Sequence, residues 1–156
     1  MKLRPYYLNP SIKKAGIQEE YTKEQVQEYI KCSDDPKYFI ENYVKINTLD
    51  HGVQPFILRD YQEEIIESFQ QNSKTIILSS RQSAKSTTSA AYLLWYTIFN
   101  ADKGVAILAN KAPVAREILS RIYLMLENLP FFLQPGVKTM NKGTVEFGNN
   151  SRIMAA

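Results

Sequence analysis

The octapeptide S-S-R-Q-S-A-K-S at residues 79–86 is the segment of this chain whose residue types most clearly indicate a chemical role. It has the length of the phosphate-binding loop G-x-x-x-x-G-K-[ST], and Lys85 and Ser86 match the last two positions of that template. Ser79 and Ala84 stand where the template has glycines. A loop of this kind points backbone N–H groups at a phosphate, and the following helix adds its positive dipole end. The expected nucleotide-binding residues are Ser79, Ser80, Arg81, Gln82, Ser83, Ala84, Lys85, Ser86 and Thr87.

The ligand that this loop predicts is a nucleotide with Mg²⁺, and the family resemblance described below implies ATP. Lys85 would reach the β- and γ-phosphates, and the Ser86 hydroxyl would bind Mg²⁺. A Lys-Ser pair after an apolar run also occurs in strand–loop–helix connections that bind nothing. The octapeptide by itself therefore leaves both interpretations open.

Two elements must position the loop. Thr75 to about Ser79 reads as a short buried strand, and helical periodicity runs from Lys85 to about Phe99. A second apolar run at Val105–Ala109 predicts another strand, covered on both faces by helices, and residues 113–129 predict a third long helix. This alternation predicts an α/β fold with a parallel sheet core.

The flanking segments predict helices before the loop and a hairpin after it. Residues 1 to about 20 read as an extended arm. Thr22 and Gln25 form a capping box for a helix to about Lys31, and Asp35-Pro36 begins another helix. The other expected elements are a turn at 50–52, a helix at 58–71, a loop at 136–143 and a β-hairpin at 144–155.

Composition excludes several classes of protein. The chain has 156 residues, enough for one domain, and its 44% hydrophobic and 22% charged residues are typical of a globular protein. It has no apolar stretch of about 18 residues and no signal-peptide pattern, so neither membrane insertion nor secretion is expected. Cys32 is the only cysteine and His51 the only histidine, which excludes an internal disulfide and a histidine cluster for metal. The net charge of +3 tolerates a polyanionic partner without predicting one.

Residues 80–86, S-R-Q-S-A-K-S, resemble the deviant Walker A loop of the large terminase subunits of tailed phages, in particular the T4-like group. Those proteins have an arginine early in the loop, where this chain has Arg81. The sequence departs from the family at Ala84, where most relatives have glycine. The resemblance covers nearly the whole chain and continues in order through residues 39–43, 50–52, 59–62, 104–111, 129–136 and 141–143.

The resemblance implies a P-loop NTPase of the additional-strand class, with a helical N-terminal extension at residues 1–55 and an ATPase part at 56–156. It implies that Gln62 recognises adenine and that Arg81 acts in cis on the γ-phosphate, which makes Arg81 and Lys85 the expected catalytic residues. Asn110 and Lys111 follow the second strand and are candidates for DNA contact or coupling. The implied partners are double-stranded DNA, a portal protein and the small terminase subunit, in an oligomeric ring in the host cytoplasm.

Carboxylates for hydrolysis are not found where the mechanism needs them. Phosphoryl transfer in this class uses an aspartate–glutamate pair at the end of an apolar strand, to hold Mg²⁺ and activate water. The acidic pairs of this sequence, at residues 19–20, 34–35 and 63–64, all precede the loop. We therefore expect the chain to be the N-terminal part of a large terminase, without the Walker B strand and nuclease domain, inactive as an ATPase alone and marginally folded. Thr75–Leu78 would then lack neighbouring strands and expose apolar surface.

Two other interpretations stay open. A helicase- or translocase-type ATPase fragment would share the adenine glutamine, the loop and the following strand. A non-catalytic module would instead dock its aromatic N-terminal helices, around Tyr38, Phe39 and Tyr43, on a portal or another partner protein.

Overall fold

The computed structural model describes residues 5–6 and 9–156 and has a mixed α/β architecture. Helices and strands alternate only in part, because the last strands follow one another directly. In chain order the elements are β1 (Pro5–Tyr6), β2 (Asn9–Lys13), α1 (Lys23–Asp34), α2 (Pro36–Tyr43), β3 (Lys45–Thr48), β4 (Gly52–Pro55), α3 (Asp60–Gln71), α4 (Lys85–Phe99), β5 (Gly104–Ile107), α5 (Ala112–Glu127), the 3-10 turn η1 (Phe131–Leu133), β6 (Val137–Met140), β7 (Thr144–Phe147) and β8 (Arg152–Ala155).

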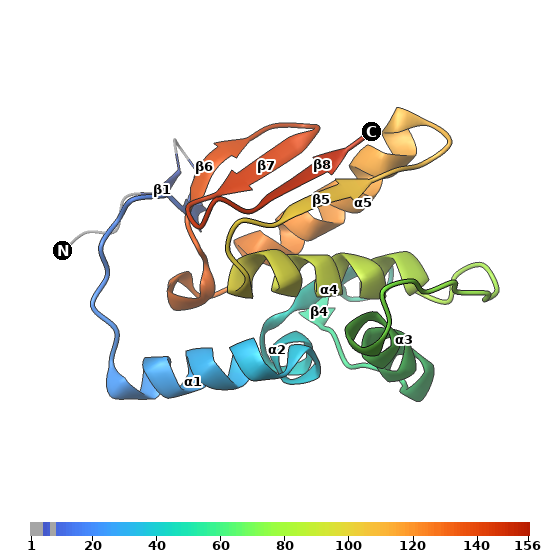
Figure 1. Cartoon of the computed structure of the whole chain (residues 1–156), viewed down its shortest axis with the longest axis horizontal. Helices are drawn as coiled ribbons and strands as arrows, with labels where there is room; N and C mark the ends of the chain where they lie inside the picture. The colour runs from blue at the N-terminus through green and yellow to red at the C-terminus, as the bar shows by residue number, and fades with distance from the viewer. Residues whose placement is uncertain (1–4, 7–8) are drawn as a thin grey trace.

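The main sheet has four strands in the order β5-β8-β7-β6, and β1–β2 and β3–β4 form separate antiparallel pairs. Within the main sheet β5 and β8 are parallel, whereas β8–β7 and β7–β6 are antiparallel. Figure 1 shows this sheet on one side of α4, with α1, α2 and α3 on the other side. Among the described strands the parallel pairing is thus confined to β5 and β8, and a parallel core stays a prediction.

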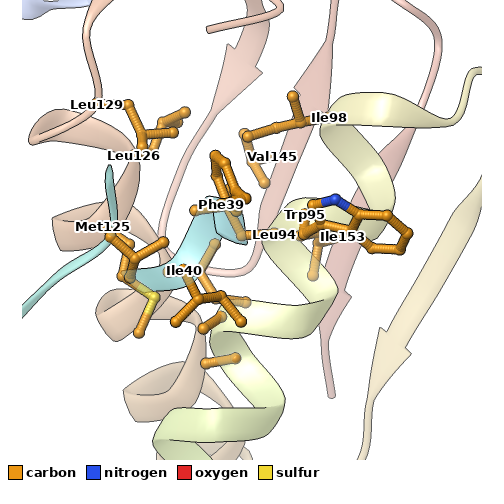
Figure 2. Packing of buried hydrophobic residues seen from close by; sticks show 14 of the residues in the cluster. Phe39, Ile40, Leu94, Trp95, Ile98, Met125, Leu126, Leu129, Val145 and Ile153 are labelled. Atoms are coloured by element: carbon orange, nitrogen blue, oxygen red, sulfur yellow. The ribbon is translucent and has the colours of Figure 1, made fainter. Parts of the chain in front are cut away.

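The hydrophobic core joins the N-terminal helices to the sheet through α4. Figure 2 shows Phe39 of α2 beside Leu94 of α4, with Val145 and Ile153 of the sheet close by. Phe39, Leu94 and Val145 are fully buried. Residues on both sides of position 55 therefore share one core cluster, in which α4 is the central element.

The helices were predicted well from local signals. The capping box is present, because the Thr22 side chain accepts a hydrogen bond from Gln25 N at 3.2 Å and Gln25 Oε1 accepts one from Thr22 N at 3.0 Å. Asp35 caps α2, accepting from Lys37 N at 2.9 Å with Pro36 at the first helical position. Helix α4 has the predicted bounds, Lys85 and Phe99. The expected hairpin at 144–155 is formed by β7 and β8.

The predicted strand at Thr75–Ser79 is wrong, because this segment forms no strand in the structure. A strand needs a partner for its backbone groups, and none of the described strands pairs with it. The expectation that its apolar side chains would be exposed is confirmed: Ile76 is 97% and Leu78 99% exposed. β5 lies at an edge of the sheet and buries alternate residues, so it is not covered on both faces as predicted.

The loop predicted at 136–143 is also wrong, since Val137–Met140 form β6 against β7. The β3–β4 hairpin was not predicted beyond its turn, because both strands carry mostly exposed residues.

Replacing Ile76 and Leu78 together with serine is expected to reduce ANS binding and concentration-dependent association. These side chains expose apolar surface on a segment whose backbone pairs with no described strand, a combination that favours contact between chains. Sedimentation velocity and ANS fluorescence would measure both effects. Ile30→Ser is the matched control, because Ile30 is 52% exposed on α1, within a hydrogen-bonded helix. An equal decrease for Ile30→Ser would contradict the prediction.

Candidate functional site

The loop that precedes α4 has the backbone conformation of a site that favours glycine. Ala84, at the second glycine position of the template, has φ 55° and ψ 21°, in the left-handed region. Gln82 is also left-handed, with φ 62°. A non-glycine residue in this region costs about 1–2 kcal/mol, so the surrounding structure must stabilise it. Lys85 follows directly as the first residue of α4, and Figure 1 shows the loop extending beyond that end of the helix.

Short-range hydrogen bonds hold the loop together. The carbonyl oxygen of Ser80 accepts from Lys85 Nζ at 3.1 Å and from Ser83 Oγ at 3.0 Å. The Ser79 and Ser83 hydroxyls lie 2.9 Å apart. The Tyr61 hydroxyl donates to the Ser83 carbonyl oxygen at 2.7 Å and links the start of α3 to the loop. The Lys85 ammonium therefore folds back over the loop, where a phosphate could replace a carbonyl as its acceptor.

A cavity of about 780 Å³ opens beside this loop. One wall is the loop itself with the first turn of α4, and the others are the β3–β4 hairpin and α5. Lys85 and Arg121 place positive charge on the lining, and Glu117 places negative charge there. The lining residues are Ile46, Asn47, Leu49, Gln82, Ser83, Ala84, Lys85, Ser86, Thr87, Glu117, Ser120, Arg121, Leu124 and Met125.

The structure brings together six of the predicted loop residues, Gln82 to Thr87, at this cavity, but not the first three. Ser79 and Ser80 are exposed and do not line it. Arg81 is exposed at the tip of the turn, and its side chain forms no hydrogen bond or ion pair with any described residue. A role for Arg81 on a phosphate would require its guanidinium to reach the cavity from outside.

Gln62 lies away from this cavity and is 3% exposed. Its Oε1 accepts from the backbone N–H of Arg59 at 2.9 Å, so it stabilises the start of α3. Its neighbour Tyr61 is the residue that contacts the loop. Gln62 is thus the sequence neighbour of a loop-contacting residue, and its own side-chain oxygen is already bonded within α3.

Asn110 and Lys111 lie at the carboxyl end of β5, where the chain enters α5. Both side chains are exposed, and Lys111 is the residue before the helix. Neither lines the loop cavity. The structure places them where a large partner could contact them, without joining them to the loop.

Sequence reasoning missed the pair Arg121 and Glu117. Arg121 Nη1 donates to Thr87 Oγ1 at 3.0 Å, and Nη2 donates to Glu117 Oε1 at 2.8 Å. The i,i+4 spacing of Glu117 and Arg121 predicts a surface ion pair on a helix. Nothing in that spacing indicates that the pair faces the loop, because its contact with Thr87 spans 34 residues.

The other candidate sites have weaker support from the structure. The Cys32 thiol is buried, and burial raises its pKa to about 12, so it stays protonated and unreactive at neutral pH. A second cavity, of about 840 Å³, lies along an adjacent face of α5, lined in part by Arg116, Tyr123 and Lys142. Phe39 is buried, and the hydroxyls of Tyr38 and Tyr43 donate to Glu28 at 3.0 and 2.7 Å, so these aromatic side chains take part in packing and hydrogen bonding among the N-terminal helices.

Comparison with known proteins adds no identification, since no protein-family model matches the sequence. Over the residues that the structure describes, no three His, Cys, Asp or Glu side chains gather as a metal site. Within the same residues, no helix combines the length and apolarity needed to cross a membrane.

Replacing Ala84 with glycine is expected to raise the free energy of unfolding by about 0.5–1 kcal/mol. Glycine adopts the left-handed conformation without strain, and this outweighs its greater freedom in the unfolded chain. Urea unfolding would measure the change. Ser89→Gly, within helix α4, is the control and should lose about 0.5 kcal/mol. Equal losses for both variants would show that Ala84 is not strained.

Proposed function

We propose that this chain binds Mg-ATP at residues 82–87, as the ATP-binding part of a large terminase subunit in a phage DNA-packaging motor. The observation that supports the proposal most directly is Ala84, left-handed at the glycine position of the template and followed at once by Lys85 at the start of α4. Alanine rarely adopts this conformation, whereas the glycine of the template adopts it without strain. The lysine also lines a cavity of about 780 Å³, which can hold a ligand as large as a nucleotide.

The chemistry of the loop follows from its residues. The first N–H groups of α4 have no intrahelical acceptor and would bind phosphate oxygens. Lys85 would exchange the Ser80 carbonyl for the β- and γ-phosphates. Ser86, at the second position of α4, fits Mg²⁺ as a single protein ligand, because Mg²⁺ beside nucleotides takes most of its other ligands from phosphates and water. Such a bound ion would neutralise phosphate charge.

Hydrolysis and DNA movement are proposed for the intact motor. Among the described residues Glu117 is the carboxylate that lines the loop cavity, and it is paired with Arg121. Glu117 lies within helix α5 and not at the end of an apolar strand, where this class holds its water-activating carboxylates, so the activity proposed for this chain itself is nucleotide binding. Double-stranded DNA, a portal protein and the small terminase subunit are the proposed partners in a ring, and Asn110 and Lys111 are the proposed contact or coupling residues. A helicase-type ATPase would use the same loop.

Base preference tests the adenine role proposed for Gln62. We expect the unmodified chain to bind ATP more tightly than GTP in a competition assay against a fluorescent ATP analogue. Gln62→Ala should reduce that preference by about 1 kcal/mol, the value of one polar contact. Gln71→Ala, at the exposed end of α3, is the matched control. Equal affinity of the unmodified chain for ATP and GTP would contradict adenine recognition by Gln62. It would not affect the phosphate-binding role proposed for Lys85.

A further inference from the structure

Arg121 approaches the first turn of α4 from a different helix. Thr87 is the third residue of α4, two positions after Lys85, and its hydroxyl accepts the guanidinium of Arg121 at 3.0 Å. The N–H groups of that turn are the ones free to bind an anion. The guanidinium of Arg121 lies beside them on the wall of the same cavity and therefore adds a side-chain cation from α5.

The present partner of Arg121 can be replaced. The Arg121–Glu117 ion pair is a surface contact, with side chains 41% and 63% exposed, and such pairs contribute little to stability. A phosphate carries more charge than one carboxylate and matches the planar fork of arginine with two parallel hydrogen bonds. Glu117 also places a negative charge on the cavity wall, where it would repel a bound phosphate.

We propose that Arg121 is a second phosphate-binding side chain of the loop site, and that it exchanges Glu117 for a nucleotide phosphate. This inference rests on the proposed function, which places a nucleotide in that cavity. The exchange releases the Glu117 carboxylate on the surface of α5 whenever nucleotide is bound. Glu117 is accordingly an internal competitor of the ligand, which lowers the affinity of the site.

Calorimetric titration with Mg-ATP tests this proposal on a set of variants. Arg121→Ala is expected to weaken binding about tenfold, as the loss of a charge-assisted contact implies. Glu117→Gln is expected to tighten binding about two- to threefold, because the competing carboxylate is removed. Arg116→Ala is the matched control: it removes the same charge from the same helix, at a position outside this cavity, and should change affinity less than about twofold.

The Glu117→Gln result separates a ligand role from a structural one. If Arg121 served only to hold α4 against α5, loss of its carboxylate partner would weaken binding or leave it unchanged, and either result would overturn the inference. If thermal unfolding shows that Arg121→Ala is not folded, the affinity of Glu117→Gln still tests the inference. Binding that depends on Lys85 but is unaffected by Arg121→Ala would overturn the inference and leave the proposed function standing. Absence of any Mg-ATP binding to the unmodified chain would overturn both.

Discussion

Lys85→Ala is expected to lower the affinity for Mg-ATP by about a hundredfold, the largest effect on binding that the site predicts. The ammonium lies at the start of α4 on the wall of the loop cavity, and a phosphate would take the place of the Ser80 carbonyl that it now contacts at 3.1 Å. Two charge-assisted hydrogen bonds of about 1.5 kcal/mol each correspond to this factor. Isothermal titration calorimetry would measure it.

The fold should survive this change, because Lys85 is only partly buried and contacts one loop carbonyl. Thermal unfolding of Lys85→Ala is therefore expected to match that of the unmodified chain. Lys74→Ala is the control for loss of charge, since Lys74 is exposed and does not line the cavity. A folded Lys85→Ala protein with unchanged affinity for Mg-ATP would contradict the assignment of the loop as a nucleotide-binding site.

Gln134→Leu is expected to lower the free energy of unfolding by about 3–4 kcal/mol, the largest effect on stability. The Gln134 side chain is 2% exposed and joins three segments of the chain. Its Oε1 accepts from Lys13 N at 2.8 Å, and its Nε2 donates to the carbonyl oxygens of Ser11 at 2.9 Å and Leu129 at 2.9 Å. Leucine keeps the volume but leaves these buried groups unpaired, at about 1–3 kcal/mol each before relaxation.

Urea denaturation would measure the loss, with Gln71→Leu as the control at an exposed position at the end of α3. The control should change stability by less than about 0.5 kcal/mol. A loss below about 1 kcal/mol for Gln134→Leu would show that water replaces the amide, and that Gln134 does not hold β2 to the C-terminal end of α5.

The helices could be predicted from the sequence because their signals are local. The capping box of Thr22 and Gln25, the Asp35-Pro36 start and the apolar periodicity of α4 each act within a few residues. The strands were harder, since whether a segment forms a strand depends on its partner. Val137–Met140 pair with β7 despite a sequence that reads as a loop, and Thr75–Leu78 pair with none of the described strands despite a sequence that reads as a strand.

The candidate site likewise contains residues that could be predicted from the sequence and residues that could not. Residues 82–87 could be identified because template, loop and helix are contiguous in the sequence. Arg121 and the β3–β4 hairpin could not, since they reach the cavity only through the packing of α5 and the hairpin. The positive φ of Ala84 shows that the backbone at this position has the conformation that glycine adopts most easily. A match of residue types alone does not give this information.

Nucleotide binding at the loop is tested most directly by an NMR titration of the ¹⁵N-labelled chain with Mg-ATP. We expect the largest amide shifts on residues 82–87 and on Arg121, and we expect Lys85→Ala to remove them. The competing location is the second cavity, along an adjacent face of α5, where Tyr123 and Lys142 would report binding. Shifts confined to that second cavity, or no shifts at millimolar Mg-ATP with the chain folded, would contradict nucleotide binding at the loop.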